Sequence, residues 1–143
     1  QASQDCADTL ALAPPNRYHS TIHAGVALEA LADWHAQSKD PQSLATLLNL
    51  AHHWVDNQYD SASQSFRHLP GQTGPGNSAM SGLCVYGLSY GALFDSDPSL
   101  RDALLNSWAG LVDVSGYGKS LAMRYRGAPR SLDRVRTLRA AIN

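Results

Sequence analysis

Four side chains able to move protons or hold a carboxylate stand in two parts of the sequence. Tyr18 and His19 are adjacent, while Arg67 and Asn77 lie in a polar stretch further along. A phenol or an imidazole can take the proton from a carbon beside a carboxyl group and protonate a leaving oxygen, and an amide or guanidinium can hold that carboxyl group. These four residues could fill the roles that β-elimination on an acidic substrate requires, although an adjacent Tyr-His pair is a common accident.

Two dyads, Tyr59-Asp60 and Arg67-His68, border the same polar stretch. Asp60 can serve as a general acid or base, and Arg67 and His68 can bind a substrate. Hydrolysis by paired carboxylates would require a second acid about 5 to 10 Å from the first. Asp56 precedes Asp60 by one helical turn and is the nearest candidate in the sequence.

His19 and His23 are four residues apart, so both lie on one face of a helix that begins by His19. Two imidazoles at this spacing can bind a metal ion, but no third ligand is evident in the sequence. We therefore interpret them as hydrogen-bonding residues, with His23 a substrate-binding candidate, and expect neither a metal nor a cofactor.

An internal repeat organises the elements that must position these residues. A shift of 57 positions aligns Gly25 with Gly82 and Leu31 with Leu88. The same shift aligns 40–41 with 97–98, 47–49 with 104–106 and 55–56 with 112–113, which makes nine identities. A repeat of this length is one supersecondary unit present twice.

Each unit indicates a helical hairpin. The first helix is apolar around most of its circumference and is expected to be buried, while the second is amphipathic and is expected to be outer. Between them an aspartate can cap the second helix, and a proline suits its first position. The sequence predicts an all-α fold, with all three tryptophans in the core. The expected parts are an N-terminal arm, 1–18, and a domain, 19–143, that comprises the repeat units 19–57 and 79–114, a polar loop, 58–78, and a basic helix, 131–142.

Composition excludes some classes of protein. The net charge is −1 and only 16% of the 143 residues are charged, so no global field attracts nucleic acid. Six of the nine arginines fall between Arg124 and Arg139, which we interpret as a solvated helix face or a subunit contact. No apolar run is long enough for a membrane span. The opening residues 1–4 suit the mature end of a secreted or periplasmic protein, or a fragment boundary, and Cys6 and Cys84 are either one disulfide or two thiols.

The hairpin pattern resembles the unit of the (α/α) toroid, the fold of many glycoside hydrolases and polysaccharide lyases. The segment 86–90, Tyr-Gly-Leu-Ser-Tyr, followed by 95–100, Asp-Ser-Asp-Pro-Ser-Leu, is similar to the inner-helix segment of the unsaturated glucuronyl hydrolase group. The resemblance covers about 19–114, two hairpins where a toroid usually has six. The Arg and Trp of that group fall on Ala79 and Leu83, so its substrate contacts do not carry over.

In the toroid enzymes the substrate cleft lies where the inner helices begin. The resemblance therefore implies a rim formed by 17–20 with His23 and by 76–78, with Tyr18, His19 and Asp60 as catalytic candidates. It implies a module that acts on a polysaccharide by hydrolysis or β-elimination. The alternative is a non-catalytic helical scaffold that self-associates through its Gly/Ala-faced inner helices, as a homo-oligomer, or completes a larger chain or assembly.

Overall fold

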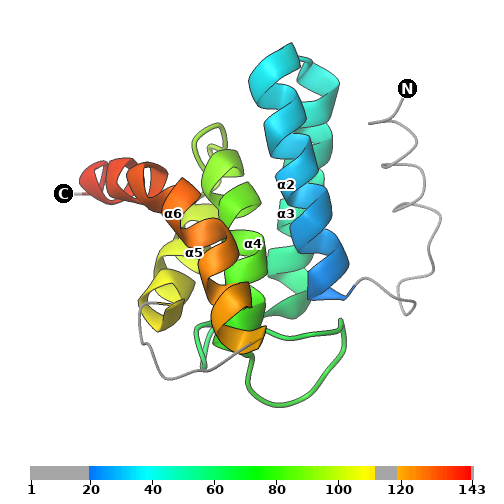
Figure 1. Ribbon diagram of the computed structural model, residues 1–143, viewed down its shortest axis with the longest axis vertical. Coiled ribbons are helices and arrows are strands. Elements are labelled where there is room, and N and C mark those ends of the chain that lie inside the picture. The colour runs from blue at the N-terminus through cyan, green and yellow to red at the C-terminus, as the bar shows by residue number, and fades with distance from the viewer. Residues whose placement is uncertain (1–19, 112–118, 143) are drawn as a thin grey trace.

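The computed structural model describes residues 20–111 and 119–142 and confirms the all-α prediction (Figure 1). The predicted arm, 1–18, and the last residues of the second predicted repeat unit, 112–114, lie outside the described residues. The elements are α2 (Thr21–Ser38), α3 (Pro41–Gln58), β1 (Tyr59–Asp60), β2 (Ser65–Phe66), α4 (Ser78–Gly91), α5 (Pro98–Leu111) and α6 (Lys119–Ala140).

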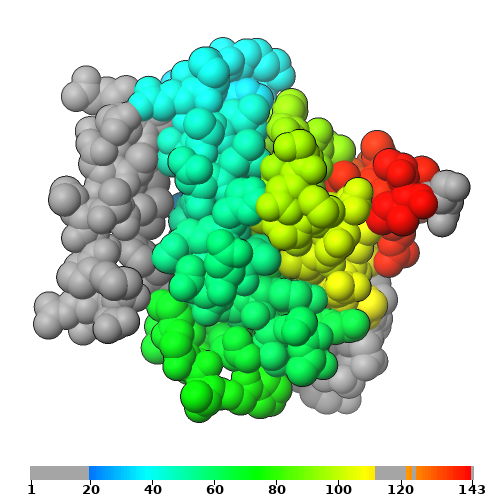
Figure 2. Space-filling view, turned by 180° about the vertical axis from the view of Figure 1, so that it is seen from behind, coloured from blue at the N-terminus to red at the C-terminus, as the bar shows by residue number. Residues whose placement is uncertain are grey.

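The helices form two layers with α4 at the centre. Helices α2, α4 and α6 begin at the same end of the molecule, and α4 packs extensively on both of the others (Figure 1). Seen from behind, α3 and α5 cover the opposite face (Figure 2). Eleven of the 14 residues of α4 are buried, which fits its nearly continuous apolar and small side chains. The largest fully buried side chains include Leu28, Leu47, Trp54, Phe66, Leu88, Leu100 and Leu104.

Both predicted Asp-Pro turns are confirmed. The Asp40 carboxylate accepts hydrogen bonds from the backbone N–H groups of Gln42 at 3.1 Å and Ser43 at 3.0 Å. At the equivalent turn the Asp97 carboxylate accepts from the Ser99 N–H at 2.8 Å. These bonds satisfy helix N–H groups that have no partner within the helix.

Glycines let α2 and α4 approach closely. A Cβ added to Gly25 would lie 2.5 Å from the Leu83 carbonyl oxygen, and one added to Gly87 would lie 2.4 Å from the Leu28 Cβ. Real Cβ atoms do not come so near, so only glycine fits at either position. The glycines that could have served self-association therefore pack against neighbouring helices of the same chain.

The prediction for the tryptophans is wrong at one position. Trp54 and Trp108 are buried, but Trp34 on α2 is 56% exposed. The cause is geometric: α2 is apolar on most sides, yet the described chain supplies neighbours on only some of them. Val26, two turns earlier on the same helix, is also exposed, at 47%.

Two further differences concern the loop and the C-terminal helix. The predicted loop 58–78 contains the short antiparallel ladder of β1 with β2. The helix expected at 131–142 is the second half of α6, which begins at Lys119 and contains Pro129. A proline inside a helix removes one hydrogen bond and clashes with the preceding turn, so the helix bends. Figure 1 shows α6 changing direction along its length.

No helix in the described ranges has the length and apolarity needed to cross a membrane. Within the same ranges, no three His, Cys, Asp or Glu residues come together as a metal site.

Candidate functional site

Hydrogen bonds join the polar segment between α3 and α4 to the ends at which α2 and α4 begin. The Thr21 N–H donates to the His68 carbonyl at 2.9 Å, and the Thr21 hydroxyl donates to the Gln58 side chain at 2.9 Å. The Asn77 N–H donates to the Phe66 carbonyl at 2.9 Å. This segment therefore lies where α2 and α4 begin, at the lower end of the molecule in Figure 1.

An ion pair holds the middle of this segment. The Arg67 Nη2 lies 2.8 Å from the Asp60 Oδ1, and the Arg67 Nε donates to the Gly74 carbonyl at 2.9 Å. The other oxygen of Asp60 accepts from the Ser63 hydroxyl, from the Ser63 N–H at 3.2 Å and from the Gly76 N–H at 3.3 Å. Asp60 and Arg67 thus fasten 60–76 into one fixed loop.

These contacts keep Asp60 ionised. The bond from the Ser63 hydroxyl is the largest contribution that lowers the pKa of Asp60. Partial burial opposes it, while the Gly76 and Ser63 N–H groups and the Arg67 charge lower the pKa further. A carboxyl group in this setting accepts hydrogen bonds and does not serve as a general acid near neutral pH.

An open pocket of about 420 Å³ lies beside the ion pair. It is lined by Asp60, Ala62, Ser63, Arg67, Gly74 and Pro75. The lining offers one carboxylate, one guanidinium, a hydroxyl and backbone polar groups, which is a set suited to a hydrogen-bonding ligand. The second carboxylate that paired-carboxylate hydrolysis requires is absent from this lining.

The predicted site residues fall into three groups. Asp60 and Arg67 come together in the pocket. His23 lies in the first turn of α2, His68 is bonded to Thr21 at the same helix end, and Asn77 caps α4, but none of the three lines the pocket. Tyr18 and His19 lie outside the described residues.

Each of the three nearby residues has its own local role. His23 is exposed, with its Nδ1 3.0 Å from the Ser20 hydroxyl. Asn77 caps α4, because its side-chain oxygen accepts from the Ala79 N–H at 2.8 Å. The His68 Nδ1 is buried and has no hydrogen-bond partner in the described part of the chain.

Sequence reasoning missed a second polar cluster, where α6 crosses α2 and α4. Arg130 is bonded to Glu29 at 2.8 Å and to Asp33 at 2.8 Å, and Arg126 pairs with Glu29 at 3.0 Å. The Tyr86 hydroxyl donates to Asp33 at 2.5 Å, and the Arg130 guanidinium lies 3.9 Å from the centre of the Tyr86 ring. The signal in the sequence was spacing: Glu29 and Asp33 are four apart on one helix, as are Arg126 and Arg130 on another.

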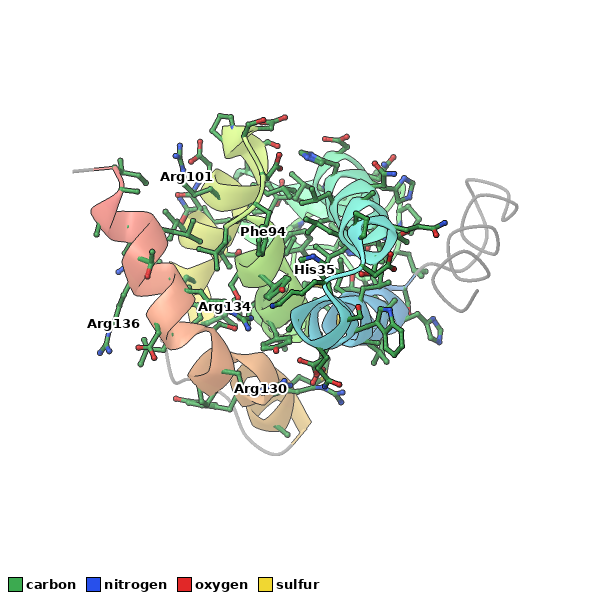
Figure 3. All side chains as sticks on the ribbon, turned by 90° about the horizontal axis from the view of Figure 1, so that it is seen from above. His35, Phe94, Arg101, Arg130, Arg134 and Arg136 are labelled. Carbon is green, nitrogen blue, oxygen red and sulfur yellow. The ribbon has the colours of Figure 1, made fainter. Side chains whose placement is uncertain are left out.

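The electrostatics of this second cluster identify it as a structural clamp. Partial burial opposes ionisation of Asp33, but bonds from Tyr86 and Arg130 and the nearby positive charges leave its pKa lowered. Figure 3 shows Arg130 and Arg134 on the side of α6 that faces the other helices. Part of the positive charge of the arginine-rich helix is therefore paired with Glu29 and Asp33 of α2.

An aromatic cluster lies at the opposite end of α4 from the pocket. The His35 Nδ1 is 2.9 Å from the Tyr90 hydroxyl, and the rings of His35 and Tyr90 both contact Phe94 (Figure 3). The Arg134 guanidinium lies 4.8 Å from the centre of the Tyr90 ring. Cys84, also on α4, is a free buried thiol, and its possible partner Cys6 lies outside the described residues.

Comparison of the chain with protein-family models, curated proteins and solved structures gives no match.

Proposed function

We propose that this chain is a carbohydrate-active module that binds an acidic polysaccharide in the pocket beside Asp60 and Arg67. The observation that supports this most is the pairing of a fixed guanidinium with a fixed carboxylate in an open pocket of about 420 Å³. This volume falls in the usual range of small-ligand pockets, roughly 300 to 1,000 Å³. A polysaccharide ligand also agrees with an extracellular or periplasmic location.

Arg67 is the group in the pocket that would bind a uronate in preference to a neutral sugar. The Arg67 Nε and Nη2 already bond to the Gly74 carbonyl and to Asp60, and the remaining N–H groups of the guanidinium can donate to a uronate carboxylate. Asp60 and the backbone carbonyl of Gly74 can also accept from sugar hydroxyls. Helices α2 and α4 also direct their N-terminal ends, which carry partial positive charge, to this side of the molecule.

Of the two reactions expected, we propose β-elimination. Hydrolysis needs a carboxylic acid and a second carboxylate, whereas Asp60 is ionised and lies in the pocket without another acid. In β-elimination Arg67 would hold the uronate carboxylate, with Asp60 keeping that guanidinium in place. Proton transfer is assigned to Tyr18 and His19, which immediately precede Ser20 in the sequence.

The experiment measures binding of the chain to a polyuronate and to a neutral glucan by titration calorimetry, and it follows unsaturated product by ultraviolet absorbance. We expect binding to the polyuronate alone, weakened at least about tenfold in Arg67→Gln, the loss expected for one charge-assisted contact. The matched control is Arg101→Gln, which removes another ion-paired arginine, on α5, that is not part of the pocket lining. Circular dichroism checks that both variants keep their helices.

Each result bears on a different part of the proposal. Failure of the unmodified chain to bind any polyuronate would overturn it. Binding without unsaturated product would retain the pocket as a binding site and remove the elimination. Equal weakening by the two arginine variants would show that Arg67 acts only through general charge.

A further inference from the structure

The contact between α2 and α4 depends on one face of each helix. Gly25 and Leu28 form the face of α2, and Leu83 and Gly87 form the face of α4. The contact is close, because a Cβ on Gly25 would meet the Leu83 backbone and one on Gly87 would meet Leu28.

The contact between α4 and α6 has the same construction. A Cβ added to Gly127 of α6 would lie 3.0 Å from a methyl carbon of Val85 and 3.2 Å from the Tyr86 Cβ. The repeat aligns Leu28 with Val85. The face of α4 that packs on α6 is therefore equivalent to the face of α2 that packs on α4. Gly127 has the same role as Gly87: each is the glycine that lets its helix pack closely on the preceding inner helix. The helices α2, α4 and α6 therefore follow one another side by side in a stack, and the same kind of helix contact occurs twice.

This construction leaves a vacant face on α2. Leu83 and Gly87 are the residues by which α4 packs on α2. The repeat aligns them with Val26 and Ala30 of α2. Val26 is 47% exposed, Ala30 is exposed, and Trp34 one turn further is 56% exposed. This surface, Val26, Ala30 and Trp34, is hereafter the leading face.

A vacant face of the complementary kind lies on α6. The shift of 40 residues that takes Gly87 to Gly127 takes Gly82 to Ala122 and Val85 to Tyr125. Tyr125 is 46% exposed and Ala122 is exposed. This surface, Ala122 and Tyr125, is hereafter the trailing face. Within the chain, faces at these positions already pack together at both helix contacts.

We propose that the trailing face of one chain packs on the leading face of a second copy, continuing the stack from one molecule to the next. Such a contact is heterologous, since the two copies use different surfaces, and it builds closed rings or open filaments. One helix face is a small interface, so the association is weak and depends on concentration. The proposal uses neither Asp60 nor Arg67 and stands independently of polysaccharide binding.

The test uses two variants that each block one face, Trp34→Glu and Tyr125→Glu. Both side chains are exposed, so neither change empties the core. Mass is measured by sedimentation equilibrium over a concentration series. We expect the unmodified chain to rise above its 15.4 kDa monomer mass and each variant alone to stay at it. An equimolar mixture should reach twice 15.4 kDa and no more, because one variant retains the trailing face and the other the leading face.

A control variant and the opposing outcomes complete the design. Ile142→Glu alters another exposed apolar residue, past the end of α6 and outside both faces, and should associate as the unmodified chain does. An unmodified chain that stays monomeric at every concentration would overturn the proposal. So would self-association of Tyr125→Glu, which would mean that the leading faces pair with each other, or a mixture that remains monomeric.

Discussion

The close approach of α2 and α4 predicts that Gly87→Ala destabilises the fold. The added Cβ would lie 2.4 Å from the Leu28 Cβ and 2.9 Å from the Leu28 carbonyl carbon. Carbon atoms pack at about 3.5 to 4.0 Å, so the helices would have to separate by roughly 1 Å. Neither obstructing atom can rotate away, because one is backbone and the other is bonded directly to it.

Two opposing effects set the size of the change. Alanine favours a helix over glycine by about 1 kcal/mol, while overpacking a core contact costs about 1 to 3 kcal/mol. Since the neighbour here is rigid, we take the upper part of that range. The expected net loss in the free energy of unfolding is therefore about 1 to 2 kcal/mol, before any repacking elsewhere.

Urea unfolding followed by far-ultraviolet circular dichroism measures this loss. Gly110→Ala is the matched control, because its new Cβ would meet only the Ser78 Cβ, at 3.8 Å, an ordinary contact. That variant should gain up to about 1 kcal/mol through helix propensity and a restricted unfolded chain. A Gly87→Ala protein as stable as the unmodified one would refute the packing argument for α2 against α4.

Two other predictions concern titratable groups. Because the pKa of Asp60 is lowered in the folded chain, its contribution to loop stability is present above the ordinary carboxyl pKa of about 4 and is lost as the pH falls through the lowered value. The NMR signal of the Gly76 amide should titrate with a midpoint below about 4, and Asp60→Asn should abolish this step; a midpoint at or above 4 would contradict it. Burial raises the pKa of the Cys84 thiol, so in a Cys6→Ser variant thiol reagents should react only after unfolding. Rapid labelling of the folded variant would show that Cys84 is accessible.

The parts of the fold that could be predicted depend on local chemistry. The start of α3 was predictable from Asp40 and Pro41 alone, since a carboxylate caps a helix whose first residue lacks an N–H. The buried α4 was predictable for a similar reason: so few of its side chains are polar that it must have neighbours on every side.

The parts that could not be predicted depend on which neighbours a segment meets. Trp34 has the same type and spacing as a core residue, and only the arrangement of the helices leaves it exposed. Pro129 normally ends a helix, yet α6 continues through it with a bend. The ladder of β1 and β2 has two residues per strand, too few for an alternating pattern.

The candidate site shows the same division. Asp60 and Arg67 were predictable as members because both border one polar stretch of sequence. The Ser63 hydroxyl and the Gly76 N–H group that lower the pKa of Asp60 were not, since only the folding of the loop brings them to the carboxylate. The contact of Arg130 with Tyr86 joins residues 44 positions apart, which no motif spans.

The ionic clamp on α6 has a consequence for the order of folding. Arg130 reaches Glu29 across 101 positions and Asp33 across 97, so these bonds close the longest loops in the described chain for which a hydrogen bond is seen. Closing so long a loop costs more conformational entropy than closing a hairpin, so we expect these contacts to form after the nearby hairpins. Added salt weakens such partly exposed pairs, so it should loosen the contact of α6 with α2 while the apolar contact of α6 with α4 remains.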